Sequence, residues 1–112
     1  MARMILNTNG TAEAAVPAFT IVKPGATDGS WLAAAAATDL MAGVSESLAA
    51  AIGERVDVAR VGIADVLYGG TVSRGQKLTS DASGPAVAAV AGNHVKGTPE
   101  ISGVVGAIGS VL

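Results

Sequence analysis

Residues 53–70 read GERVDVARVGIADVLYGG, and this stretch decides the fold class expected for the chain. Val56 and Val58 alternate with Arg55 and Asp57, which is typical of a β-strand with one buried and one exposed face. Arg60 breaks the alternation, and Gly62 follows it closely, where a β-bulge can reset the pattern. The stretch therefore predicts two strands, 55–61 and 63–68, separated by a bulge.

Turn signals recur at short intervals along the rest of the chain. Fifteen glycines among 112 residues supply the positive φ angles that tight turns need. Short segments between closely spaced turns predict an all-β fold, a small β-barrel or sandwich of short strands. The remaining expected strands are 19–23, 30–37, 40–44, 77–79, 86–90 and 108–112.

Two alanine-rich segments fit either strand or helix, because alanine has the highest helix propensity. For residues 33–37 we expect a strand. For residues 47–52 we expect a loop or one short helix.

Residues 1–17 show no sustained periodicity and leave two alternatives open. We predict an extended N-terminal arm, followed by a single β-rich domain at 18–112. In that arm Met4, Ile5 and Leu6 are the candidate contacts to a partner. The alternative is a first edge strand from Met4 to Thr8.

The apolar half of the composition is mostly alanine and valine, with Phe19, Trp31 and Tyr68 as the aromatic residues. Alanine buries little area, so we expect a small domain of this kind to gain stability by self-association or by docking on a larger body. Trp31 is the candidate interface residue, since tryptophan is enriched at binding hot spots. The alternative for Trp31 is a place in the core.

The sequence offers no support for catalysis. Cysteine is absent, and the single histidine, His94, lies in a turn-like stretch where we expect a solvated loop. The nine acidic residues are dispersed, and the glycines form neither a phosphate-binding loop nor a dinucleotide fingerprint. We therefore predict no enzymatic activity, no metal, no cofactor and no small-molecule substrate.

Charge and hydropathy exclude two further classes of partner. The net charge is −2 and the basic residues are scattered, which argues against nucleic acid. The most apolar stretch, 31–37, is too short to cross a membrane. Polar residues 7–10 interrupt the apolar start before a signal peptide could form, so we expect synthesis in a cytosol.

The order of short motifs resembles the capsid decoration, or head cement, proteins of tailed bacteriophages. The resemblance covers roughly residues 18–112. It rests on Gly53–Val58, Gly62–Val66, Gly69–Leu78 and Asp81–Val87, with upstream support from Val22–Gly25 and Gly43–Val44.

The resemblance implies a structural virion protein on the outer face of the phage head, made in the cytoplasm of a bacterial host. It implies self-association, commonly as a homotrimer, and binding to the major capsid protein, so that neighbouring capsid subunits are bridged. Two alternatives stay open. One is another virion component, such as a head-fibre base or a tail part, and the other is a biotinyl- or lipoyl-type carrier domain.

Overall fold

The computed structural model describes residues 3–90, 93, 95 and 97–112 of the protein, and for residues 3–5 it describes the backbone alone. The described residues form strands joined by turns, without a helix, which confirms the all-β class. The strands are β1 (Arg3–Ala12), β2 (Ile21–Pro24), β3 (Ser30–Ala33), β4 (Gly43–Ser45), β5 (Arg55–Leu67), β6 (Leu78–Ser80), β7 (Ala86–Ala88) and β8 (Ile108–Val111).

Five of these strands close into a small barrel in the order β1-β3-β2-β4-β5, and β5 then pairs with β1. The β1–β3 pair is parallel, and the other pairs of the barrel are antiparallel. Closure matters because it pairs strand edges that would otherwise expose free N–H and C=O groups. Of the two expected architectures, the barrel is therefore the one found.

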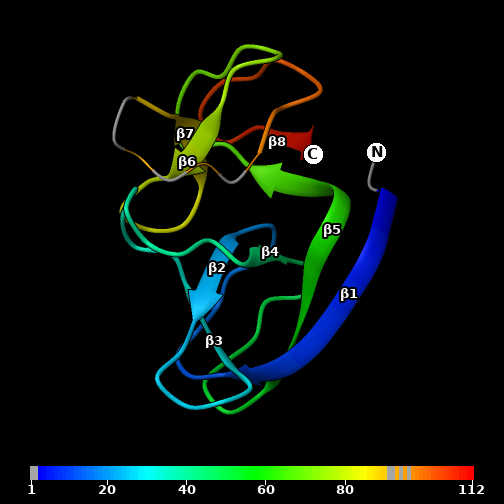
Figure 1. Ribbon diagram of the computed structural model, residues 1–112, viewed down its shortest axis with the longest axis vertical. Helices are drawn as coiled ribbons and strands as arrows, with labels where there is room; N and C mark the ends of the chain where they lie inside the picture. The colour runs from blue at the N-terminus through cyan, green and yellow to red at the C-terminus, as the bar shows by residue number, and fades with distance from the viewer. Residues whose placement is uncertain (1–2, 91–92, 94, 96) are drawn as a thin grey trace.

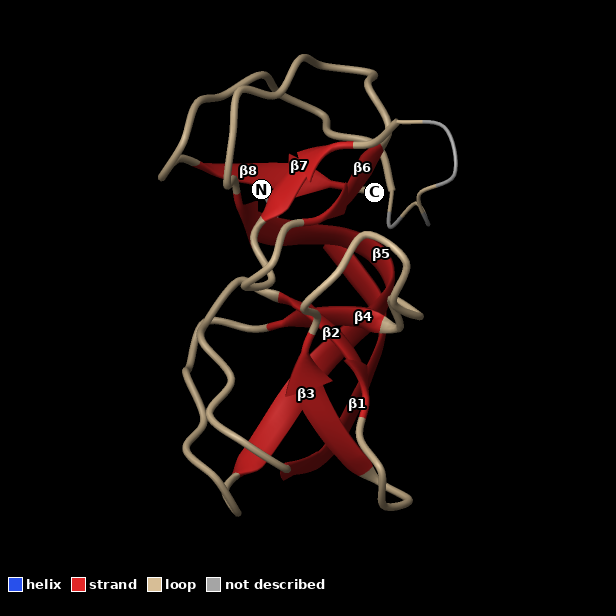
Figure 2. Ribbon diagram, turned by 90° about the vertical axis from the view of Figure 1, so that its left-hand side faces the viewer, coloured by secondary structure: helices blue, strands red, loops and turns tan. Residues whose placement is uncertain are grey.

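Strand β5 is the longest element and connects two levels of the molecule. Its first part pairs with β1 and β4 in the barrel, and its last four residues pair with β8 above it (Figures 1 and 2). The β1–β5 register shifts on both sides of Leu6, and Gly62 has a φ of 108°. The two expected strands are thus one bent strand, and the bulge predicted near Gly62 is found.

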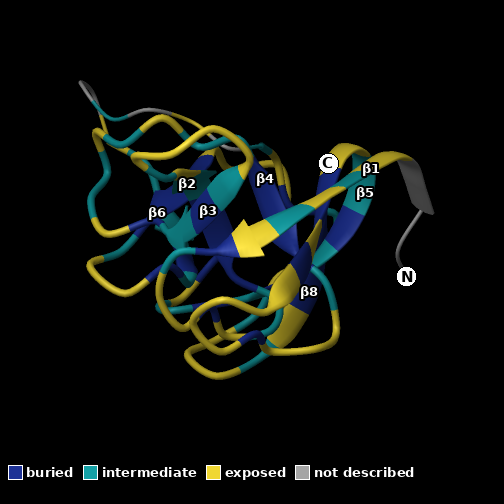
Figure 3. Ribbon diagram, turned by 90° about the horizontal axis from the view of Figure 1, so that it is seen from below, coloured by how far each residue is buried: buried dark blue, intermediate teal, exposed yellow. Residues whose placement is uncertain are grey.

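The buried side chains form two clusters. Figure 3 shows buried residues on the strands and exposed residues along most of the loops. The cluster of the barrel comprises Ala12, Val16, Val22, Trp31, Ala50, Val56 and Val58. The second cluster joins barrel strands to the β6–β7 hairpin and β8, and it comprises Ile21, Ala34, Val44, Ala59, Ala64, Val66, Tyr68, Val72, Leu78, Ala86 and Val111. Most of these side chains are small, so both cores are narrow.

The prediction of an extended arm at 1–17 is corrected, because strand β1 occupies residues 3–12 of the barrel. Its register runs from Arg3 opposite Ile63 to Thr11 opposite Arg55. Val16 then forms a β-bridge with Ala50. The strand alternative is therefore the one observed, and the strand is longer than Met4–Thr8. Periodicity is weak here because a polar outer face and small inner residues hide the alternation.

The alanine-rich segments follow tertiary hydrogen bonds instead of intrinsic propensity. The strand expected at 30–37 ends at Ala33, and the Ala34 amide donates to the Ile21 carbonyl at 2.8 Å. Residues 47–52 form a loop, in which Ala50 exchanges two backbone hydrogen bonds with Val16. Hydrogen bonds to specific residues of the barrel outweigh the helix preference of alanine. Relative to most other residues, that preference is less than about 1 kcal/mol per residue.

The barrel depends on β1, so a chain beginning at Ala18 is expected to lose its cooperative fold. Such a chain lacks the strand that pairs with both β3 and β5 and leaves two edges open. Circular dichroism on heating should show a broad, weak transition in place of a sharp one. A shortened chain with the melting temperature of the full chain would contradict the place of β1 in the barrel.

The barrel also needs glycine at position 10, where β1 passes Trp31. A Cβ there would lie 2.6 Å from Trp31 Nε1 and would meet the Gly29 carbonyl oxygen. We expect Gly10→Ala to destabilise the protein by about 1–3 kcal/mol, the usual cost of overpacking. Urea unfolding followed by the fluorescence of the single tryptophan measures it. The control is Gly70→Ala, whose Cβ would meet only Val87 Cγ1 at 3.5 Å, and it should unfold like the parent.

Candidate interaction surface

Trp31 lies inside the barrel and is 9 % exposed, so the core alternative for this residue is the one observed. Strand β3 directs it toward Val22, Val56 and Val58, with the edge of its indole against Gly10. The guanidinium of Arg60 covers the ring at 5.2 Å from the centroid, and Arg60 Nε donates to the Ala42 carbonyl at 3.1 Å. The cation–π contact screens Trp31 from solvent, which leaves it a poor interface anchor.

The candidate contacts Met4, Ile5 and Leu6 lie on the first part of β1. The side chains of Met4 and Ile5 are outside the described structure. Leu6 is 49 % exposed and pairs in register with Val61, which is 50 % exposed. Two apolar side chains thus stand side by side on the outside of the barrel, at the bulged part of the β1–β5 pair.

A second apolar surface is built on Tyr68, directly after β5. The Tyr68 hydroxyl donates to the Ile101 carbonyl at 2.8 Å, and the Tyr68 backbone bonds to both Gly106 and Ala107. Gly103 and Gly109 lie against the phenol ring, where any Cβ would collide with it. These contacts order residues 101–108, a loop that ends at the first residue of β8 and that we call the Tyr68 loop.

The Tyr68 loop turns four apolar side chains outward: Ile101, Val104, Val105 and Ile108. Its tip is a turn in which the Ala107 amide donates to the Val104 carbonyl, with Gly106 at a φ of 86°. Sequence reasoning does not predict this surface. An available signal is the spacing of three residues between Gly103, Gly106 and Gly109, and in the structure Gly103 and Gly109 lie against one aromatic ring.

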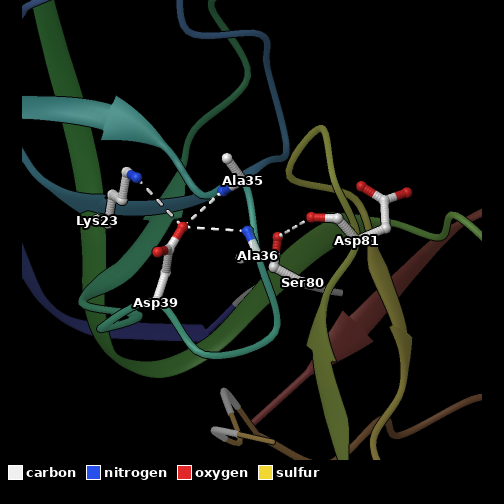
Figure 4. Close-up of polar contacts among 6 residues, drawn as sticks. All are labelled: Lys23, Ala35, Ala36, Asp39, Ser80 and Asp81. Carbon is white, nitrogen blue, oxygen red and sulfur yellow. Dashed lines mark hydrogen bonds and ion pairs between the residues drawn. The ribbon is translucent and has the colours of Figure 1, made fainter.

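The loop between β3 and β4 is fixed by Asp39 (Figure 4). Its carboxylate accepts hydrogen bonds from the amides of Ala35 and Ala36 and pairs with Lys23 Nζ at 3.2 Å. The Ala35 amide, with help from Lys23, lowers the pKa of Asp39 below its ordinary value, although desolvation opposes the shift. Asp39 therefore has a structural role, because its ionised carboxylate accepts hydrogen bonds from two backbone amides of the loop.

A shallow cavity of about 160 Å³ lies beside β4 and β5. Phe19, Ser45, Glu46, Ser47, Ala59, Ala64 and Asp65 line it. Phe19 takes a φ of 54°, an unusual angle for a bulky residue, and its carbonyl accepts from the Leu67 amide at 2.8 Å. The cavity is lined by apolar and acidic groups together, and it is smaller than the roughly 300–1,000 Å³ of typical small-molecule sites.

The described part of the chain contains no group of three histidine, cysteine or acidic side chains placed to bind a metal. His94, expected in a solvated loop, lies outside the described residues. No helix long and apolar enough to cross a membrane occurs within the described ranges.

The architecture defines a small closed barrel of five strands that carries a second β-layer on one long bent strand. No family model matches the chain, and no curated protein matches it. A solved structure with a similar fold is the head fiber gp8.5 N base of bacteriophage phi29, with a TM-score of 0.78 and 19 % sequence identity. The alignment covers 95 % of this chain and 91 % of that chain, so the whole fold is shared.

Tyr68 provides a test of how the Tyr68 loop is held. Burial raises the pKa of Tyr68 in the folded chain. The protonated phenol therefore contributes its full stabilisation below the unfolded-state pKa of about 10, and this stabilisation falls as the pH rises from that value toward the folded-state pKa. We expect the absorbance of its phenolate to appear at higher pH in the folded chain than in urea. Tyr68→Phe should be less stable at neutral pH by about 0.5–1.5 kcal/mol, the usual value of a lost hydrogen bond, and should lose less stability above about pH 10.

The chain has one tyrosine, so the phenolate signal needs no deconvolution. Identical titrations of the folded and the unfolded chain would contradict the buried position of Tyr68. The same result would remove the support of the Tyr68 loop.

Proposed function

We propose that this protein is a structural component of a tailed-bacteriophage virion that binds the outer face of the head, with the major capsid protein as its partner and without catalytic activity. The observation that carries the proposal is the likeness of the whole fold to the phi29 head fiber base. The motif order over residues 18–112 supports it independently, since that order resembles proteins that decorate phage heads.

The architecture suits attachment to a surface. A closed barrel leaves few strand edges for uncontrolled pairing, and its exposed loops remain available for specific contacts. The ordered Tyr68 loop and the fixed loop at Asp39 need little ordering when a partner binds, which lowers the entropy cost of association.

Two forms of this role have separate support. The likeness to the phi29 structure favours the base of a head fibre, whereas the motif resemblance favours a cement protein that bridges capsid subunits. The two differ in their effect on the head, because only a bridging protein is required to strengthen it. The carrier-domain alternative has no comparable support, since the turn at 73–76 has Arg74 and Gly75 in its centre and Lys77 lies beyond it.

Cosedimentation with phage heads tests the proposal. We expect the full chain to pellet with expanded, empty heads of its phage and to saturate at a defined number of copies. Heads before expansion are the control, because their surface lattice differs. Saturated heads that resist heating better than bare heads would assign the cement role, and unchanged heads would assign the fibre base. An absence of pelleting with both kinds of head would contradict head binding altogether.

We propose that the capsid contact lies on β1 at Leu6, and the paired apolar side chains that Leu6 and Val61 expose support this proposal. Leu6→Asp should weaken head binding by about tenfold or more, because burying a carboxylate against an apolar partner is costly. The matched control is Leu40→Asp, which changes a leucine that is also exposed but lies in the loop between β3 and β4. Both variants should unfold like the parent. Equal binding by the two variants would move the contact away from β1.

A further inference from the structure

The Tyr68 loop gathers four of the exposed large apolar side chains within eight residues. Val104 and Val105 at its tip are 62 % and 69 % exposed. Scattered surface leucines and valines are ordinary, but apolar groups concentrated on one ordered loop mark an interaction site.

The loop is held rigidly although its side chains face solvent. Val72 and Gly103 exchange two backbone hydrogen bonds of 2.9 Å, and the Arg74 amide donates to Ser102 Oγ at 3.0 Å. Together with the bonds to Tyr68, these contacts fix the backbone before any partner arrives. A surface ordered in advance loses little conformational entropy on binding, which favours a specific partner.

The charges around the loop indicate which partner fits. Residues 101–112 contain no charged side chain, in a chain whose net charge is −2. Among the described residues, Arg74 on the neighbouring turn and Glu100 directly before the loop carry charges of opposite sign at its rim. Within the described ranges neither forms an ion pair. Such a surface can face a copy of itself without like-charge repulsion, and it can set Arg74 of one copy beside Glu100 of the next.

We propose that the Tyr68 loop is the surface through which one copy of this chain binds a second copy. Val104 and Val105 form the apolar centre of the contact, and Arg74 and Glu100 orient it at the rim. The inference concerns the chain alone and does not require that it binds a phage head.

The contact is weak in free solution. Four side chains bury far less than the roughly 800 Å² per partner of a stable interface. Copies held side by side on a common support experience effective concentrations of about a millimolar, and there the same contact becomes populated. Self-association is therefore expected to depend on concentration, and to be strongest where many copies are attached.

Sedimentation equilibrium over a range of concentrations tests the proposal. The average mass of the parent chain should rise with concentration, and Val105→Asp should raise the dissociation constant by about tenfold or more, since it buries a charge in an apolar contact. The matched control is Leu48→Asp, which places the same charge on a side chain that is 81 % exposed in the loop before β5. A parent chain that stays monomeric up to about a millimolar, or a larger effect of Leu48→Asp than of Val105→Asp, would overturn the proposal.

A second experiment does not depend on how Val105→Asp folds. Arg74→Glu and Glu100→Arg should each weaken self-association, because each places like charges together at the rim. An equimolar mixture of the two variants should associate better than either alone, since a carboxylate at position 74 of one then meets a guanidinium at position 100 of the other. A mixture no better than the separate variants would overturn the assignment.

Binding to expanded heads separates this inference from the proposed function. If both hold, Val105→Asp still binds heads, with a lower apparent affinity and without contacts between copies in electron micrographs. Loss of all head binding by this variant, with self-association unchanged, would assign the Tyr68 loop to the capsid instead. If the chain self-associates but does not bind heads, the result would support this inference and contradict only the proposed function.

Discussion

The antiparallel pairing of β1 with β5 closes the barrel, and the other features of the molecule are built around it. The pairing extends from Arg3 opposite Ile63 to Thr11 opposite Arg55, and it joins the first strand of the chain to the longest one. Because β1 also runs parallel to β3, removal of this one strand opens the ring on two sides. The bulges around Leu6 bend β5 at that point, so that its last residues leave the barrel and pair with β8. Closure and bending thus arise from the same strand pair.

The narrow cores require that backbones and rings approach each other closely, and glycine makes this possible. Gly10 admits the edge of Trp31 into the barrel, and Gly103 and Gly109 admit the ring of Tyr68 into the second cluster. Each of the two aromatic residues is surrounded mainly by valine, alanine and glycine. In a chain with few large side chains, these two aromatic residues bury a large share of the apolar surface, since aromatic side chains bury the most area. Other apolar side chains, such as Val104 and Val105, remain exposed to solvent.

The residues considered for the interaction surface fall into two groups, those that stabilise the fold and those that are accessible to a partner. Trp31 and Asp39 serve the fold, because one is enclosed in the barrel beneath Arg60 and the other fixes a loop. Leu6 and the Tyr68 loop are exposed yet ordered, a combination that fits a protein whose partners are other proteins. The proposed attachment through β1 and self-association through the Tyr68 loop use different residues, so each contact can form without the other.

The sequence alone determined the all-β class, most strand positions and the turns. Alternating residues such as Val56 and Val58, and glycines at Gly53, Gly75 and Gly106, show local conformational preferences that agree with the fold. Only the tertiary structure decided that residues 3–12 are a barrel strand, that Ala34 leaves β3 for a loop, and that Trp31 is enclosed. These outcomes depend on contacts with residues distant in the chain. Strand β1 consists mainly of small and polar residues, so its pairing with β5 produces no hydrophobic periodicity in the sequence. For the Tyr68 loop the sequence shows the spacing of the glycines but not the exposure of Val104 and Val105, because that exposure depends on the contacts by which Tyr68 holds the loop.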